Sequence, residues 1–482
     1  MAKTVPRLTF DRGTLLLHPP PSSGAWAGIA EWDDRIERLR APAWQYRKLL
    51  EGLRRDNVLL EDKAKSFENL ELQLANTQAP FAHQTAALEA WIGAGRQGVV
   101  ILPTGSGKSF LAMLAMQRTQ RSTLICVPTL DLMHQWYANL QAAFPEVQIG
   151  LHGGGSKDLS NILISTYDSA HRLIEHNGNR WGLLIFDEVH HLAGDLYKTI
   201  AEYSLAPYRL GLTATLERPD GRHSSILELV GQVAYRATPE DLAGNALAPY
   251  DLVRLSVELS PAERQEYEAH LETRTTFLKK RHIRLSNLEG WSRFVRESAK
   301  SQDGRRAMLA HRELKRLAKA SDAKLRTLDQ ILQDHLEERT LIFTDDNETV
   351  YDISKKLLIP AITHQTPVKE RHAILDFFRA GTYPVLVASR VLNEGVDVPE
   401  ASLAVVLSGT ASNREHVQRL GRILRPRPNK RAKLIEVISK DTVEEATAKR
   451  RHEKLEPIQT KQPRAGLEKI EQALSFDDLV GL

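Results

Sequence analysis

The chain has 482 residues, enough for more than one domain at about 150 residues each. Its composition, 42% hydrophobic and 26% charged, is that of an ordinary globular protein, which excludes a disordered or fibrous class. The net charge of +4 is too small to indicate nucleic-acid binding by itself, and the single cysteine, Cys126, excludes an intrachain disulfide and a four-cysteine metal site. No apolar stretch approaches the roughly 18 residues of a membrane span, and no signal segment is recognised, so we expect a cytoplasmic protein.

Residues 1–75 differ in pattern from the rest of the chain. Residues 8–17 predict two strands joined by a turn at Asp11-Arg12-Gly13. A proline-rich segment at residues 19–21 interrupts the pattern, and residues 42–54 are compatible with a helix. We therefore expect a small α+β module here, outside the domain that follows.

A glycine-rich turn follows the apolar run at residues 98–102. Its sequence is Pro103-Thr104-Gly105-Ser106-Gly107-Lys108-Ser109, and helix-forming residues come next. Backbone N–H groups in such a turn, together with the helix N-terminus, bind phosphate. Lys108 would reach the β- and γ-phosphates of ATP, and the Ser109 hydroxyl would hold Mg²⁺. A turn without a ligand is the alternative, but strand, turn and helix occur here in the order that nucleotide binding needs.

Short apolar strands alternate with helix-sized segments between residues 81 and 237. The expected strands are Val99–Leu102, Ser122–Val127, Ile162–Ser165, Leu183–Phe186 and Arg209–Thr213. This alternation predicts a parallel sheet with right-handed crossovers.

Two adjacent carboxylates end the predicted strand at residues 183–186. Asp187 can hold Mg²⁺, directly or through water, and Glu188 can position and deprotonate an attacking water. His190 and His191 follow, but no second Cys or His cluster completes a metal site around them. Carboxylates after a strand are common, so the prediction depends on the phosphate-binding turn upstream.

The stretch from Ala262 to Gln333 is charged and has long helical periodicity. Residues 260–324 hold 16 Lys and Arg against 9 Asp and Glu, a net charge of +7 that leaves −3 for the rest of the chain. A basic excess confined to one segment indicates an element that faces phosphates. An ordinary solvated helical face is the alternative.

A second α/β pattern follows. The expected strands are Thr340–Phe343, Tyr383–Ala388, Leu403–Leu407 and Lys433–Val437. Between the last two lies Gln418-Arg419-Leu420-Gly421-Arg422-Ile423-Leu424-Arg425, which places Arg422 and Arg425 on one helix face. Guanidinium groups suit the charge of a transferring phosphoryl group, so these arginines would complete the ATP site when two domains close. A surface pair in salt bridges is the alternative.

We thus expect an α/β protein with four parts. Residues 1–75 form the N-terminal module and residues 76–240 the first motor domain. Residues 241–460 form the second motor domain, with a basic helical insert at about 260–321. Residues 461–482 form a tail, either a partner-binding peptide or a frayed end.

Between residues 80 and 440 the order of these motifs resembles that of superfamily 2 helicases and translocases, which have two RecA-like motor domains. Further matching segments are Phe81-Ala82-His83-Gln84 (Q-motif), Val127-Pro128-Thr129 (Ia), Ile164-Ser165-Thr166-Tyr167 (Ib), Gly211-Leu212-Thr213-Ala214-Thr215 (III), Leu341-Ile342-Phe343-Thr344 (IV) and residues 387–399 (V). The implied ATP-site residues are Gln84, Thr104, Gly105, Ser106, Gly107, Lys108, Ser109, Asp187, Glu188, Gly395, Asp397, Gln418, Arg422 and Arg425. The implied nucleic-acid contacts are Pro128, Thr129, Ser165, Thr166, Thr213, Thr215, Arg218, Asp220, Phe343 and Ser389.

Within that superfamily the chain resembles the xeroderma pigmentosum group B (XPB) helicases of the short prokaryotic type. The resemblance rests on Asp187-Glu188-Val189-His190-His191, on the segment 418–425, and on an N-terminal module similar to the family's damage-recognition domain. The basic insert lies where the family has its thumb-like element. Two positions depart: Pro219 replaces the Glu of an Arg-Glu-Asp element implicated in strand separation, and Phe81 replaces an Arg of the Q-motif region.

The resemblance implies an ATP-dependent DNA helicase or translocase, with Mg²⁺ and 3′→5′ polarity, that acts in DNA repair. We expect a nucleoid-associated monomer that binds duplex, forked or damaged DNA, with a nuclease partner as in some relatives. A DExH RNA helicase and a restriction-system motor subunit remain alternatives. A non-catalytic DNA-binding scaffold is another, although Lys108, Asp187 and Glu188 are intact.

Overall fold

The chain divides into two units in the computed structural model, with described residues in the ranges 5–242 and 250–445. The residues that the structure describes are 5–21, 24, 26–75, 79–216, 221–242, 250–285, 288–389, 401–408 and 432–445. The predicted tail at residues 461–482 lies outside them.

The N-terminal module is a five-stranded sheet in the order β3-β4-β2-β1-β5. Its elements are β1 (Arg7–Asp11), β2 (Thr14–His18), β3 (Glu31–Asp33), β4 (Arg38–Pro42), a short 3₁₀ helix (Ala43–Gln45), α1 (Tyr46–Arg55) and β5 (Glu61–Asp62). The β1–β2 hairpin turns at Arg12 and Gly13, both with positive φ, as the Asp-Arg-Gly sequence predicts. The α+β prediction is confirmed, although β3, β4 and β5 were not expected.

The module packs directly on the first α/β domain. Gly13 is required at this junction, because a Cβ built on it would lie 2.4 Å from the Tyr203 ring. Arg47 donates to Gly95 O at 2.5 Å, and Asn179 donates to Ala64 O at 2.9 Å. Backbone groups take part in these contacts, so the module and the domain fold against each other rather than meeting through mobile side chains alone.

The first α/β domain is built on an eight-stranded sheet in the order β13-β6-β12-β11-β7-β10-β8-β9. The strands are β6 (Gln97–Ile101), β7 (Thr123–Val127), β8 (Ile149–Gly153), β9 (Ser156–Lys157), β10 (Ile162–Thr166), β11 (Leu183–Asp187), β12 (Tyr208–Thr213) and β13 (Val233–Arg236). All pairs are parallel except β8–β9. Every predicted strand is present, and β8, β9 and β13 extend the sheet beyond the prediction.

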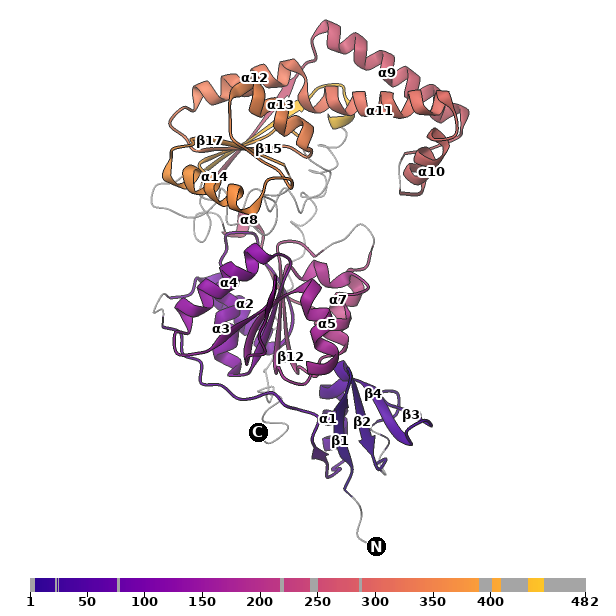
Figure 1. Ribbon diagram of the computed structural model, residues 1–482, viewed down its shortest axis with the longest axis vertical. Coiled ribbons are helices and arrows are strands. Elements are labelled where there is room, and N and C mark those ends of the chain that lie inside the picture. The colour runs from indigo at the N-terminus through magenta and orange to yellow at the C-terminus, as the bar shows by residue number, and fades with distance from the viewer. Residues whose placement is uncertain are drawn as a thin grey trace. The chain divides into compact units, whose positions relative to one another are not determined.

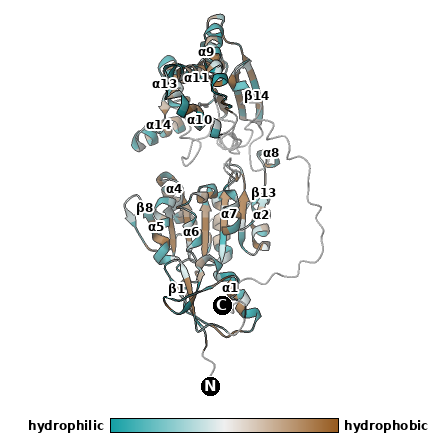
Figure 2. Cartoon of the chain, turned by 90° about the vertical axis from the view of Figure 1, so that its right-hand side faces the viewer, coloured by the Kyte–Doolittle hydropathy of each residue, from teal (hydrophilic) through white to brown (hydrophobic). Residues whose placement is uncertain are grey.

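Helices cover both faces of this sheet, which is why its central strands are buried throughout. They are α2 (Ala82–Gly93), α3 (Lys108–Thr119), α4 (Leu130–Ala143), α5 (Tyr167–Asn177), α6 (Thr199–Glu202), α7 (His223–Leu229) and α8 (Pro239–Leu242), with a 3₁₀ helix at Val189–Ala193. Figure 1 shows α2, α3 and α4 on one face and α5 and α7 on the other. Figure 2 shows the hydrophobic strands between helices of mixed polarity.

The second unit is built on a six-stranded parallel sheet in the order β14-β19-β18-β15-β17-β16. Its strands are β14 (Tyr250–Val257), β15 (Thr340–Phe343), β16 (Ala361–Ile362), β17 (Val385–Ala388), β18 (Leu403–Val406) and β19 (Ala432–Ser439), and its sheet-covering helices are α12 (Asp322–Asp334), α13 (Asn347–Leu357) and α14 (Val368–Ala380). Two separate parallel α/β sheets confirm the predicted fold class.

The basic segment forms three helices beside this sheet, α9 (Pro261–Lys280), α10 (Leu288–Ser298) and α11 (Gln302–Ala320). A capping box starts α9, since the Ser260 hydroxyl accepts from Glu263 N while the Glu263 carboxylate accepts from Ser260 N. A small core of Phe277, Phe294 and neighbouring apolar residues holds the helices together. The prediction of a helical insert is confirmed.

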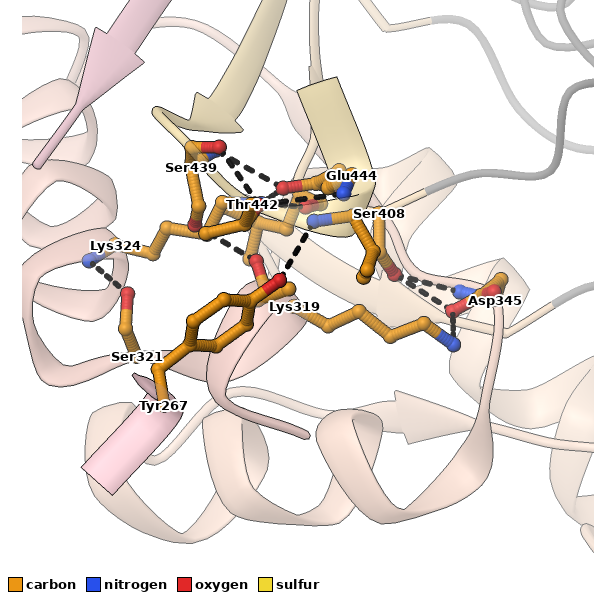
Figure 3. A network of polar contacts seen from close by, with 12 residues as sticks. Tyr267, Lys319, Ser321, Lys324, Asp345, Ser408, Ser439, Thr442 and Glu444 are labelled. Carbon is orange, nitrogen blue, oxygen red and sulfur yellow. Dashed lines mark hydrogen bonds and ion pairs between the residues drawn. The ribbon is translucent and has the colours of Figure 1, made fainter. Parts of the chain in front are cut away.

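A buried ion pair joins α12 to the ends of β18 and β19 (Figure 3). Lys324 is fully buried, and its Nζ donates to Leu407 O and to Glu444 Oε2, each at 2.5 Å. The same Glu444 oxygen accepts from Ser439 N at 3.0 Å. The charge of the lysine is therefore compensated inside the fold.

A second network joins α11 to the ends of β15 and β18 (Figure 3). Lys319 Nζ lies 2.7 Å from Asp345 Oδ1, and the Ser408 hydroxyl donates to the same oxygen at 2.9 Å. Burial would raise the Asp345 pKa, but the Lys319 charge and these hydrogen bonds lower it.

Candidate ATP site and DNA-facing edge

Five predicted motifs lie along one edge of the first sheet. The neighbouring strands β6, β12, β11, β7 and β10 end there in register, with Thr213 opposite Ile101, Asp187 opposite Leu212, and Thr166 opposite Val127. The segments that follow these strands are the glycine-rich turn and motifs III, II, Ia and Ib. The carboxyl edge of a parallel sheet is where α/β proteins bind their ligands.

The glycine-rich turn has the backbone that phosphate binding needs. Gly105 and Gly107 have φ of 85° and 81°, and a Cβ on Gly107 would lie 2.3 Å from Gln84 Nε2. Lys108 opens α3, and its Nζ donates to the turn's own carbonyls, Leu102 O at 3.1 Å and Pro103 O at 3.4 Å. Among the residues that the structure describes, the buried Thr104 hydroxyl has no hydrogen-bond partner. An amine held over the turn and an unsatisfied hydroxyl within it both fit an anionic ligand.

Residues of α2 support the turn from behind. The buried Gln84 amide donates to Ser106 O at 3.2 Å and to Gly107 O at 3.3 Å, and its oxygen accepts from Phe81 N at 2.9 Å. A ring nitrogen of His83 lies 2.8 Å from Ser106 O. The Q-motif segment thus holds the shape of the turn, while contact of Gln84 with adenine stays a prediction.

Asp187 is the buried carboxylate of the edge, with 7% of its surface exposed. Trp136 Nε1 donates to its Oδ2 at 2.8 Å, and Glu188 N donates to its Oδ1 at 3.1 Å. Burial raises the Asp187 pKa, and the Trp136 hydrogen bond and the Lys108 charge oppose that rise. A carboxylate and the Ser109 hydroxyl are oxygen ligands of the kind that Mg²⁺ takes beside phosphates, so the residues present fit the ion.

Glu188 is held in an unusual backbone conformation and linked to motif III. It lies in the left-handed region with φ of 49°, which is uncommon for a residue with a side chain. Its Oε2 lies 3.3 Å from the Thr213 hydroxyl and 3.4 Å from His190 Nδ1. The Thr213 hydroxyl also bonds to Thr215 O at 2.7 Å. Motifs II and III therefore share one hydrogen-bond network.

Three of the predicted nucleic-acid contacts have buried side chains, and their contact with nucleic acid stays a prediction. The side chains of Ser165, Thr213 and Phe343 are fully buried, because all three lie within strands that helices cover on both faces. The Ser165 hydroxyl bonds to His152 O, inside the domain. Pro128, Thr129 and Thr215 are partly exposed, Thr166 and Ser389 are buried at the ends of their strands, and Arg218, Asp220, Gly395, Asp397, Gln418, Arg422 and Arg425 lie outside the described residues, as does Pro219.

Two contacts of Asp187 were not expected from the sequence. Trp136 lies within α4, where its apolar ring predicts a core position and nothing more. Tyr167 is the last residue of motif Ib and opens α5, and its hydroxyl donates to Asp187 O at 2.9 Å. No sequence pattern indicates that either aromatic residue bonds to Asp187.

Three family profiles match the chain in the predicted order. They are the xeroderma pigmentosum group B helicase damage recognition domain at residues 8–64, the type III restriction enzyme res subunit at 77–218, and the helicase conserved C-terminal domain at 323–427. Together they cover the N-terminal module, most of the first sheet with the ATP-site edge, and much of the second unit.

Sequence identity to known proteins shows which helicase family the chain belongs to. "DNA 3'-5' translocase XPB2" of Sulfurisphaera tokodaii is 39% identical over 447 residues, which cover 92% of this chain and 99% of that protein. The chain belongs to the XPB family. "DNA 3'-5' helicase XPB" of Kineococcus radiotolerans and of Mycobacterium tuberculosis are each 32% identical, over 74% and 69% of this chain and 59% and 56% of their own lengths. The XPB family resemblance of the sequence is thereby confirmed.

A solved structure supports the fold of this XPB-family chain. The Pyrococcus furiosus Hef helicase domain superposes with a TM-score of 0.51 at 20% identity, over 77% of this chain and 97% of that one. It agrees with two RecA-like domains. Among the described residues, no helix combines the length and the apolarity that a membrane crossing requires.

Proposed function

We propose that this chain is an ATP-driven motor that moves along duplex DNA with 3′→5′ polarity and acts in DNA repair. The chain is an ATP-dependent DNA helicase or translocase, as the sequence predicts and membership in the XPB family confirms. The observation that carries the finer proposal is the shared edge of the first sheet, where a phosphate-binding turn, Asp187 and Glu188 adjoin motifs Ia and Ib.

The turn and the end of β11 would hold ATP and its metal ion. The backbone of residues 104–107 would bind the phosphates, and Lys108 would exchange its two carbonyl partners for phosphate oxygens. Ser109 and Asp187 would hold Mg²⁺. When bound, Mg²⁺ would neutralise negative charge on the phosphates.

Glu188 would act as the base that positions and deprotonates water. Its Oε2 faces the Thr213 hydroxyl and His190, so motif III orients the carboxylate. Arg422 and Arg425, with Gln418, would supply charge to the transferring phosphoryl group, and Gly395 and Asp397 would complete the site. These roles follow from the sequence motifs.

DNA would lie against the ends of β7 and β10, beside Pro128, Thr129 and Thr166, with Thr215, Arg218, Asp220 and Ser389 as further contacts. Contacts of this kind reach backbone phosphates and carry little base preference. The basic helices α9 to α11 would add attraction for the phosphates. We further propose a monomeric, nucleoid-associated cytoplasmic protein with a nuclease partner.

The test is a comparison of ATPase rates with duplex DNA, single-stranded DNA and RNA, beside strand displacement on a forked duplex. We expect duplex DNA to stimulate turnover. Because Pro219 replaces the family's carboxylate, we also expect displacement to be weak and to increase in Pro219→Glu. Stimulation by RNA alone would favour an RNA helicase and overturn the proposal.

A further inference from the structure

Two buried aromatic side chains converge on Asp187 from two different helices. Trp136 of α4 donates its indole N–H to Asp187 Oδ2 at 2.8 Å, and Tyr167 of α5 donates its hydroxyl to Asp187 O at 2.9 Å. Both donors are nearly inaccessible, with 1% and 2% of their surface exposed. One bond fixes the carboxylate and the other fixes the backbone that carries it.

Each donor belongs to a helix that begins at a proposed DNA contact. Thr129 is the N-cap of α4, and its hydroxyl accepts from Leu132 N at 3.3 Å. Trp136 lies about two turns further along the same helix. A shift of the α4 N-terminus is therefore carried by a continuous helix to the indole that holds the carboxylate.

The second connection is shorter. Thr166 is the N-cap of α5, and Tyr167 is the first residue of that helix. The Tyr167 ring also packs on Phe186 and His191, which flank the Asp187–Glu188 pair on either side in the sequence, with ring centroids 6.4 and 5.8 Å apart. A movement of Thr166 would therefore be transmitted to Asp187 through Tyr167 alone.

We propose that Trp136 and Tyr167 are positioning residues that couple DNA contact at motifs Ia and Ib to the metal-holding carboxylate, Asp187. This inference rests on the proposed function, since it assumes Mg²⁺ at Asp187 and DNA at Thr129 and Thr166. DNA then sets the orientation of Asp187 through two hydrogen bonds, without touching the ATP site.

The indole bond has the larger expected effect on metal affinity. Loss of a hydrogen-bond partner of a metal-binding carboxylate typically lowers metal affinity by about 10- to 100-fold. Trp136→Phe keeps an aromatic ring in the core and removes the N–H donor. We expect the Mg²⁺ concentration for half-maximal ATPase, and the Kd for Mn²⁺ measured by electron paramagnetic resonance with a non-hydrolysable ATP analogue, to rise about tenfold.

Trp91→Phe is the matched control. Trp91 has the same 1% exposure, and its indole donates to a backbone carbonyl, Arg209 O, at 2.9 Å in the same domain. The substitution removes the same atoms and an indole hydrogen bond, here to a backbone carbonyl, outside the motifs. We expect comparable thermal destabilisation in both variants, but a change in Mn²⁺ affinity only in Trp136→Phe.

Tyr167→Phe removes the hydroxyl that bonds to the Asp187 backbone. It tests the proposal independently if Trp136→Phe does not fold. We expect the ratio of the ATPase rate with duplex DNA to the rate without DNA to fall about fivefold or more relative to the unaltered protein. Its control is Tyr46→Phe, which removes a buried hydroxyl bonded to Asp62 Oδ2 at 2.6 Å in the N-terminal module.

The outcomes separate this inference from the proposed function. If duplex DNA does not stimulate the unaltered protein, the proposed function fails. If DNA stimulates the unaltered protein and Tyr167→Phe to the same degree, or Mn²⁺ affinity in Trp136→Phe matches that in Trp91→Phe, the coupling inference is overturned and the function stands.

Discussion

Each α/β unit places charged residues at the carboxyl edge of its own parallel sheet, but the two units differ in how those charges are compensated. At the carboxyl edge of the first sheet, burial raises the pKa of Asp187, and Lys108 Nζ donates to two backbone carbonyls of its own turn. At the carboxyl edge of the second sheet, Lys319 lowers the pKa of Asp345, and Lys324 is bonded to Glu444.

The difference distinguishes an edge that binds a ligand from an edge that holds helices on its sheet. An edge that must receive a charged ligand keeps charges and hydroxyls that the ligand can satisfy, at some cost in stability. An edge that must hold helices on a sheet compensates its charges internally. The basic helices α9 and α11 are also held to this edge by hydrogen bonds between neutral groups, since Tyr267 OH accepts from Val443 N and Ala318 O accepts from the Ser439 hydroxyl.

The largest expected effect is on the second edge. Lys324→Met leaves the Glu444 carboxylate buried without its cation, which typically costs about 3–5 kcal/mol. Hydrogen exchange of peptides that cover β18 and β19 measures this loss where it occurs. The double variant Lys324→Met/Glu444→Leu removes both charges, and we expect it to recover most of the stability. Equal hydrogen-exchange protection in Lys324→Met and the unaltered protein would show that the Lys324–Glu444 ion pair does not stabilise this edge.

The next effect is on the first edge and concerns rate rather than stability. Lys108→Ala removes the amine that would bind the phosphates, and we expect at least about a 100-fold fall in kcat for ATP hydrolysis. Because Lys108 donates only to carbonyls of its own turn, we expect the unfolding temperature to change little. Unchanged turnover would show that the turn is not the ATP site.

The third expected effect is on stability at pH 7, where removing a carboxylate should have opposite signs at the two edges. In the absence of Mg²⁺, the raised pKa of Asp187 means that the folded protein loses stability as pH rises above the carboxyl's ordinary value of 3.8. Asp187→Asn should therefore be more stable than the unaltered protein at pH 7. The lowered pKa of Asp345 contributes stability above pH 3.8, and this contribution is lost as pH falls through the folded pKa. Asp345→Asn should be less stable at pH 7.

Urea unfolding at pH 7 and at about pH 3.5 checks both signs. Each difference from the unaltered protein should shrink at the lower pH, because the carboxyl groups bind protons there in the unfolded chain as well. If both variants shift stability in the same direction at pH 7, the contrast between the two edges is wrong.

Much of the fold could be predicted, because buried parallel strands are short apolar runs that need no distant partner to be recognised. Ile162–Ser165 and Thr340–Phe343 are found within one residue of their predicted ends. Strand β14, at Tyr250–Val257, escaped prediction because polar residues interrupt its apolar residues and its place is set by pairing with β19, 182 residues away.

The candidate site was predictable where chemistry is local in sequence, as at residues 103–109 and 187–188. It was not predictable where a side chain serves a distant residue. Trp136 and Asp187 are 51 positions apart. Asp187 ends β11 and Trp136 lies in α4, which follows β7, and the pairing of β11 with β7 brings the two side chains together. The burial of the Phe343 side chain was likewise not predictable, because a motif marks a segment and does not say which of its residues point outward.

Cys126 lies in the middle of this sheet, fully buried in β7, and is the sole thiol of the chain. Burial raises the pKa of its thiol far above the ordinary value, so it stays protonated and unreactive toward alkylating reagents. The protein is therefore already suited to site-specific labelling. A pair of introduced surface cysteines, one in each unit, can carry fluorescent or spin labels without replacing a native residue, and the distance between them will follow the motor through its cycle.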